Sequence, residues 1–143
     1  MSGFLGRYEF QMDEKGRVSL PSVFRKEAEG DRFVLLQWER PYLTLFPEPV
    51  WREVQKRLVE YRRGDPQAGH HVREITSNAV EVSPDKQGRI LIPSWLQESA
   101  ALEGTVLLNG NIDRVEIWNP EEYGKAVGGG SEDFPGFAHK IFG

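Results

Sequence analysis

The sequence of 143 residues contains no cysteine, so disulfide bonds, thiolate metal sites and cysteine nucleophiles are excluded together. It also has no apolar run near the ~20 residues that a membrane-spanning helix needs. The opening MSGFLGRYEF lacks the charged segment and apolar core of a secretory signal, and Met-Ser is not the Met-Gly of a myristoylation site. From these absences we expect a soluble cytoplasmic protein.

Common enzyme motifs are missing as well. There is no Gly-rich phosphate loop, G-x-S-x-G elbow or dinucleotide fingerprint. The one grouping that resembles metal ligands is His70, His71 and Glu74, and so few ligands without a further partner are more typical of a solvated helix face. We therefore expect no enzymatic activity, no cofactor and no metal site.

An excess of positive charge is absent too, since the formal net charge is −4. Residues 1–72 hold 12 Lys and Arg against 11 Asp and Glu, a balance of +1, whereas residues 73–143 hold 6 against 11, a balance of −5. Any attraction to phosphate must therefore be local, and this distribution favours the first half.

An internal repeat is the main feature that the sequence does contain. Residues 8–51 align with residues 80–123 at a constant offset of 72, and ten of these 44 positions are identical. Two copies of this length indicate a duplicated half-domain, because a solenoid needs three or more repeats to bury its core. We expect half-domains over 1–72 and 73–127 that share one core, followed by a flexible Gly-rich tail over 128–143.

Each copy predicts the order strand, turn, strand, short helix, strand, strand. The segments YEFQM and VEVS alternate apolar and polar residues as strands do. DEKGR and DKQGR predict hairpin turns, in which Asp13 or Asp85 bonds the backbone and Gly16 or Gly88 supplies a positive φ. VSLP and ILIP are the return strands, each ended by a proline that has no N–H to donate.

Short helices are expected after these prolines, each with one buried apolar face formed by Val23, Phe24 and Ala28 or by Trp95, Leu96 and Ala100. PVWREVQKRLVEYRR predicts an amphipathic helix of about four turns, and HHVREITS a further short one. A weaker helix is expected over 121–127. The four tryptophans are assigned to packing rather than to stacking on bases: Trp38, Trp51, Trp95 and Trp118.

The glycine of each turn places Arg17 or Arg89 at the start of a return strand, near an exposed tip. An arginine there can bond bidentately to guanine or to phosphate. Two alternatives stay open. The turn can be purely structural, with Asp13 paired to Arg17, or Asp13 and Asp85 can share a proton as in an aspartic protease, although the neighbouring cations favour their ionised forms.

The doubled D-x-x-G-R-[VI]-x-[LI]-P resembles the signature of the MraZ family, bacterial proteins with two half-domains of the AbrB-like swapped-hairpin class. DEKGRVSLP and DKQGRILIP both match it in the expected order, and the resemblance covers roughly residues 1–125. It implies an α+β fold of two tandem AbrB-like half-domains, related by a pseudo-twofold duplication, that share a β-barrel-like core and carry added amphipathic helices.

The resemblance also implies a function. It predicts a transcriptional regulator, usually a repressor, of the division and cell-wall gene cluster, which binds repeated G-rich boxes of double-stranded DNA as a ring-like homo-oligomer associated with the nucleoid. The base-contacting role carries over to Arg17 with Lys15 beside it, and Arg89 receives an auxiliary role because Gln87 replaces that lysine. The predicted DNA-contacting residues are Arg17, Lys15, Gly16, Arg7, Arg89 and Lys86, and the turn-forming residues are Asp13, Asp85 and Gly88.

Subunit contacts are predicted for the amphipathic helix with Trp51 and for the tail residues Phe134, Phe137 and Phe142. For the helix, packing inside its own subunit is the alternative. The competing function is a ring-forming scaffold that contacts another protein and not DNA. No membrane contact and no small-molecule substrate is expected.

Overall fold

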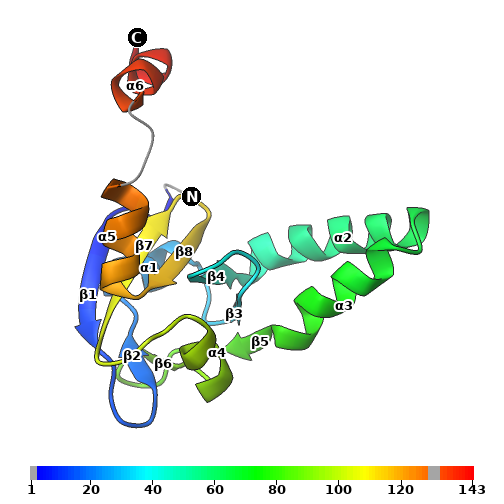
Figure 1. The fold of residues 1–143 in the computed structure, drawn as a ribbon. Coiled ribbons are helices and arrows are strands. Elements are labelled where there is room, and N and C mark those ends of the chain that lie inside the picture. The colour runs from blue at the N-terminus through cyan, green and yellow to red at the C-terminus, as the bar shows by residue number, and fades with distance from the viewer. Residues whose placement is uncertain (1–2, 129–132) are drawn as a thin grey trace.

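A computed structural model describes residues 3–128 and 133–143 of the chain, which form an α+β fold (Figure 1). The first copy of the repeat contains β1 (Arg7–Gln11), β2 (Arg17–Ser19), α1 (Ser22–Glu27), β3 (Phe33–Leu36) and β4 (Leu43–Pro47). Helices α2 (Glu48–Gly64) and α3 (Ala68–Asn78) connect it to the second copy. That copy contains β5 (Val80–Val82), β6 (Arg89–Leu91), α4 (Ser94–Ser99), β7 (Thr105–Asn111) and β8 (Arg114–Trp118), and the helices α5 (Pro120–Gly128) and α6 (Phe134–Phe142) follow.

The predicted order of elements within each copy is confirmed. Strands β2 and β6 begin and end 72 residues apart, and so do the helices α1 and α4. Pro21 and Pro93 stand directly before these helices as their N-caps, where the missing N–H ends the strand and leaves no helical hydrogen bond unmade. The amphipathic helix is also confirmed as α2, and α3 and α5 form at the other two predicted places.

Strands from the two copies alternate in the main sheet, so neither copy has a sheet of its own. The six-stranded antiparallel sheet has the order β1-β7-β8-β4-β3-β5, and β2 pairs with β6 in a separate two-stranded ribbon. Equivalent residues face each other twice, Val18 opposite Ile90 and Thr44 opposite Glu116. A pseudo-twofold axis therefore runs through both pairs and relates one half of the chain to the other.

The prediction of a local hairpin in each copy is wrong. The turns form, but β2 takes β6 of the other copy as its ladder partner in place of β1. The reason is burial: Val18 and Ile90 meet at the centre of the ribbon and both lie in the shared core, which contains side chains from both copies. Removing this apolar surface from water favours the exchanged pairing over two separate hairpins.

Helix α2 packs by its N-terminal part on the outer face of the main sheet. Trp51 is buried there with Val34, Leu36 and Phe46. Further along, α2 lies beside α3 in a helical hairpin that extends away from the sheet (Figure 1). Tyr61, near the end of α2, is exposed. Packing inside the subunit thus accounts for the buried side of α2, on the sheet in its first part and on α3 further along, and leaves its other side exposed.

Some side chains predicted to be buried are exposed. Val23 and Trp95 are 51% and 54% exposed, and Trp38 is half exposed, whereas Trp51 and Trp118 are buried as predicted. Helices α1 and α4 have only six residues each, and Phe24 and Leu96 fill the space beneath them. A preceding residue is turned ~100° around such a short helix and so points to solvent.

The flexible Gly-rich tail over 128–143 stays a prediction, and the structure adds a helix within it. Residues 134–142 form helix α6, in which Phe134, Phe137 and Phe142 are exposed, and residues 129–132 lie outside the described part of the chain. None of the helices in residues 3–128 and 133–143 has both the length and the apolar character needed to cross a membrane.

Candidate nucleic-acid interface

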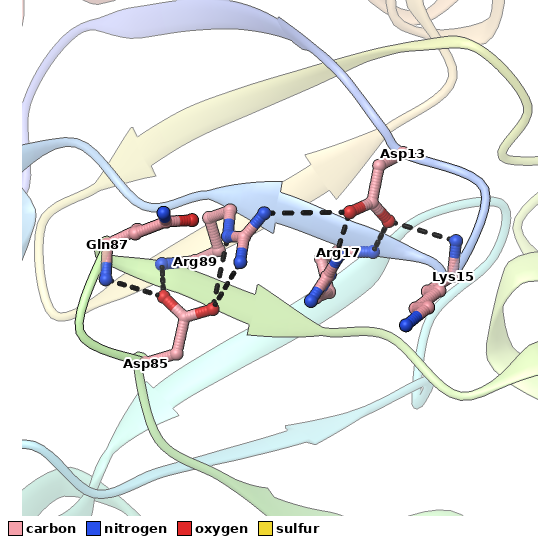
Figure 2. Close-up of polar contacts among 6 residues, drawn as sticks. All are labelled: Asp13, Lys15, Arg17, Asp85, Gln87 and Arg89. Carbon is pink, nitrogen blue, oxygen red and sulfur yellow. Dashed lines mark hydrogen bonds and ion pairs between the residues drawn. The ribbon is translucent and has the colours of Figure 1, made fainter.

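Two turns, tip 1 (residues 13–17) and tip 2 (residues 85–89), have nearly the same geometry (Figure 2). At tip 1, Asp13 Oδ1 accepts hydrogen bonds from the backbone N–H groups of Lys15 at 3.0 Å and Arg17 at 2.8 Å, and Asp13 Oδ2 accepts one from Arg17 Nε at 2.7 Å. At tip 2, Asp85 accepts the equivalent bonds from Gln87 N, Arg89 N and Arg89 Nε at 2.9, 2.9 and 3.1 Å. Each aspartate therefore shapes its turn and holds its arginine.

Glycine is required in both tips by a positive φ, and in tip 1 also by the close approach of a backbone carbonyl. Gly16 and Gly88 have φ values of +87° and +78°, which L side chains rarely adopt. A Cβ at Gly16 would also lie 2.8 Å from the carbonyl oxygen of Ile92, and a Cβ at Gly88 would lie 2.8 Å from Arg25 Cζ. The Ile92 N–H donates to Gly16 O at 2.9 Å, and this hydrogen bond connects tip 1 to the second copy of the repeat.

The ribbon of β2 and β6 brings both tips to one outward face. Val18 and Ile90 occupy its inner, buried face, and the alternating side chains of the strands point outward: Arg17, Ser19, Arg89 and Leu91. Arg17 and Arg89 are partly exposed there, at 33% and 28% of their side-chain surface. Arg89 Nη1 also lies 3.7 Å from Asp13 Oδ2, which links tip 2 to tip 1 (Figure 2).

The aspartates are charged in this arrangement. Hydrogen bonds from the Arg17 backbone N–H and side chain hold the pKa of Asp13 below its usual value, and the bonds from Arg89 and Gln87 do the same for the pKa of Asp85. Two carboxylates that share a proton would instead have one raised pKa. The carboxyl pair of an aspartyl hydrolase is thus contradicted by its own surroundings.

Each guanidinium keeps N–H donors for a further acceptor. Arg17 uses Nε on Asp13, which is one of its five N–H donors. At tip 1 the carboxylate therefore orients the group without occupying its terminal amino nitrogens. At tip 2, Arg89 Nη2 also lies 3.0 Å from Asp85 Oδ2 and Nη1 lies 3.7 Å from Asp13 Oδ2, and each amino group keeps a second N–H. A planar guanidinium fixed in this way is suited to bidentate contact with guanine or phosphate.

Of the predicted DNA-contacting residues not yet described, two lie at the tips and one lies on β1. Lys15 and Lys86 are exposed at tip 1 and tip 2, respectively. Arg7 begins β1, at the end of the strand away from tip 1, and its guanidinium carbon lies 5.9 Å from the centre of the Tyr123 ring. The structure thus brings all the predicted DNA-contacting residues together except Arg7.

One cation at tip 2 was not predicted from the sequence. Arg25 of α1 lies against Gly88, although it belongs to the other copy of the repeat. The repeat offset of 72 makes Arg25 equivalent to Gln97. In the structure Gln97 Nε2 lies at Gly16 of the opposite tip, as Arg25 lies at Gly88. The offset therefore points to Arg25 only when the exchanged pairing of β2 and β6 is known.

No grouping of three or more His, Asp or Glu side chains suited to a metal ion occurs within the described residues. His70 of α3 lies 3.4 Å from Arg73 through its Nδ1. A cation beside this ring opposes metal binding, which adds to the sequence argument for a solvated helix face.

Comparison with known proteins places this chain in a family. A model of the family described as "MraZ protein, putative antitoxin-like" matches residues 4–70 and 75–133. The chain belongs to the MraZ family. It is 34% identical over 138 residues to the transcriptional regulator MraZ of Leuconostoc citreum, and the match covers 96% of each chain. It is 39% identical over 140 residues to the transcriptional regulator MraZ of Pelotomaculum thermopropionicum, covering 96% of this chain and 94% of the relative.

MraZ membership agrees with the resemblance found in the paired DxxGR motifs. It places the chain among proteins named as transcriptional regulators and not among enzymes. The hydrolase alternative is therefore rejected on two separate grounds, the family and the lowered pKa values of Asp13 and Asp85.

Proposed function

We propose that the protein regulates transcription by binding double-stranded DNA with the outward face of the β2–β6 ribbon. The observation that carries this proposal is the pair of tips that present Arg17 and Arg89 side by side, each oriented by its own aspartate. Strands are established readers of DNA grooves, and arginine bidentate to guanine is the commonest base contact. The name of the relatives adds independent support.

The resemblance to MraZ proteins refines the proposal. The protein acts in the cytoplasm, at the nucleoid, as a repressor of the division and cell-wall gene cluster, and it recognises repeated G-rich boxes as a ring-like homo-oligomer. The exchanged pairing of β2 with β6 supports the AbrB-like swapped-hairpin class. Lys15 and Lys86 contact phosphate beside the two arginines, while Gly16 lets the backbone turn close to the DNA.

Assembly is needed for physical reasons. One arginine bidentate to guanine contributes about 1–3 kcal/mol of discrimination, too little for a monomer to select an operator. Several identical ribbons facing evenly spaced boxes add through effective concentration. A symmetric ring facing repeated boxes gives each subunit the same contact, so a chain with a net charge of −4 can still bind DNA.

The structure supports a larger role in DNA binding for Arg89 than the auxiliary one expected from the acidic charge of residues 73–143. Arg89 is nearly as exposed as Arg17 and shares its face. At the position equivalent to Glu14 of tip 1, tip 2 has Lys86. We therefore assign base or phosphate contacts to both arginines, with Arg17 as the residue carried over from the family.

Exposed aromatic side chains on α6 favour the second candidate function, a scaffold that assembles with protein alone. One experiment separates the two. DNA from upstream of the protein's own gene is titrated with protein in a fluorescence anisotropy assay at several salt concentrations, with scrambled DNA as competitor. The proposal predicts specific binding that weakens steeply with salt. An assembled protein that shows no salt-sensitive preference for this DNA would reject the proposal and favour the scaffold.

A further inference from the structure

Arg25, a residue of the first copy, forms part of the surface of tip 2. It lies in the last turn of α1 and is exposed. A Cβ at Gly88 would lie 2.8 Å from Arg25 Cζ and 3.0 Å from both Nε and Nη2, so the flat guanidinium covers this glycine. Arg25 Nε donates to Leu20 O at 3.1 Å, which fixes the group in place.

The second copy repeats this arrangement with a neutral side chain. Gln97 of α4 is equivalent to Arg25, and its Nε2 donates to Ile92 O at 2.6 Å, as Arg25 Nε donates to Leu20 O. Gln97 Nε2 is also the side-chain atom closest to a Cβ at Gly16. The structural task of supporting the opposite tip therefore needs an N–H donor at this position but no positive charge.

The extra charge makes the two tips unequal. Tip 1 holds two anions and two cations, namely Asp13, Glu14, Lys15 and Arg17. Tip 2 with Arg25 holds one anion and three cations, namely Asp85, Lys86, Arg89 and Arg25. The acidic half of the chain thus contains the more basic tip, because a helix of the other half supplies an arginine to it.

We infer that Arg25 is a further DNA-contacting residue, and that tip 2 with Arg25, Lys86 and Arg89 is the principal phosphate-binding part of the ribbon. This inference rests on the proposed function. Arg25 keeps its two terminal amino groups beyond the bond to Leu20 O, and these can donate to two oxygens of one phosphate. An exposed charge that the fold does not need, held beside two further cations, is suited to contact an anion.

The test uses the full-length protein and the upstream DNA, with each substitution chosen from the repeat itself. Arg25→Gln installs the side chain that the equivalent position already tolerates, so the free energy of unfolding and the assembly size are expected to stay unchanged. Kd is expected to rise about tenfold, the effect of losing a charge-assisted hydrogen bond. The slope of log K against log salt is expected to fall by about one for each Arg25 in contact with DNA.

Lys26→Gln is the matched control, because it removes the same charge from the next residue of the same helix, which is also exposed. Its effect on Kd and on the salt slope is expected to be much smaller. Gln97→Arg is the reciprocal change, and we expect it to add a cation to tip 1 and tighten binding. Arg25→Lys is expected to keep most of the salt slope because it keeps the charge.

The outcomes separate the inference from the proposed function. If the wild-type protein shows no salt-sensitive binding, the proposed function fails before Arg25 is tested. If the wild type binds and Arg25→Gln behaves as the wild type or as Lys26→Gln does, the inference is overturned while the proposed function stands. Should Arg25→Gln lower the melting temperature, the salt slopes of Arg25→Gln and Arg25→Lys are compared: the inference predicts a slope lower by about one per contacting Arg25 in Arg25→Gln alone, whereas a purely structural role predicts the same slope in both variants.

Discussion

The guanidinium of Arg89 lies 3.7 Å from the carboxylate of Asp13, a residue that starts the turn in the other copy of the repeat. The same Asp13 oxygen accepts the bond from Arg17 Nε. One carboxylate thus faces both arginines, and the two tips form a single charged surface rather than two separate ones. Changes at either tip are therefore expected to be felt at the other.

Arg17→Ala and Arg89→Ala are each expected to weaken binding to the upstream DNA by at least about tenfold, the loss of one bidentate contact per tip. The two effects are expected to be non-additive in a double-mutant cycle, because both arginines contact Asp13. Anisotropy titrations of both variants and of the double variant measure this. Arg63→Ala, in the last turn of α2, is the control and should bind as the wild type does. Unchanged affinity in Arg17→Ala would remove Arg17 from the interface.

Gly16→Ala is expected to lower the free energy of unfolding by about 2–4 kcal/mol, since alanine must adopt a positive φ and its Cβ meets the carbonyl of Ile92. Urea denaturation measures the change. Gly69→Ala is the control, because Gly69 lies in α3 with no atom within 4 Å of its Cβ position, and there alanine is expected to be neutral or stabilising. Equal effects in the two variants would contradict the close approach of tip 1 to the second copy.

Ala101→Gly is expected to stabilise the protein by about 0.5–1 kcal/mol, a rise in Tm of a few degrees. Ala101 follows α4 with a φ of +52°, and its equivalent Glu29 follows α1 with a φ of +55°, so both occupy a conformation that suits glycine. Thermal unfolding followed by circular dichroism provides the measurement. Ala126→Gly within α5 should be destabilising by a similar amount. A lower Tm for Ala101→Gly would show that this φ carries no strain.

Stability is expected to decrease as the pH falls below the usual carboxyl pKa of 3.8. The pKa values of Asp13 and Asp85 are lowered in the folded state, so the unfolded state binds more protons in this range, and protonation favours unfolding. The contribution is fully present above about pH 4 and is lost as the pH passes through the lowered values. Urea denaturation at a series of pH values follows this loss.

The double variant Asp13→Asn and Asp85→Asn provides the comparison for that series. An amide keeps an oxygen acceptor for the backbone N–H groups but has no proton to gain, so the decline below pH 4 should be smaller than in the wild type. Asp31→Asn removes a carboxylate outside both tips and should leave the decline as it is. The same slope in all three proteins would show that the tips do not contribute to acid unfolding.

Phe137→Ser together with Phe142→Ser is expected to reduce the size of the proposed assembly in light scattering, because these α6 side chains are exposed in the single subunit and a subunit contact there would bury them. Each buried phenylalanine contributes about 1.5–3 kcal/mol. Lys140→Ser on the same helix is the control. An unchanged assembly size would contradict a subunit contact at α6 and leave the exposed side of α2 as the predicted contact.

Much of the local structure was predictable from the residues themselves. The turns follow from Asp13 and Gly16 and from their equivalents, since an aspartate bonds its backbone two residues on and glycine accepts a positive φ. The strands and helices follow from apolar periodicity and from the prolines that separate them. These effects act over a few residues, and so the order of elements was read correctly in both copies.

Pairing between strands that are distant in the chain could not be predicted in this way. Periodicity shows that Val18 and Ile90 are strand residues with one apolar face, and the same pattern is compatible with two local hairpins or with one shared ribbon. It also gave no sign that six-residue helices leave Val23 and Trp95 exposed. Which of these arrangements forms depends on the total apolar surface buried by all elements together.

By itself, the sequence determined the duplication, the chemistry of both turns and the family, because each of these depends on residue identities at fixed spacing. Only the tertiary structure decided that β2 pairs with β6, that Arg17 and Arg89 share one face, and that Arg25 lies at Gly88. The physical reason is that the buried core joins both copies, so burial at Val18 and Ile90 sets which charges become neighbours.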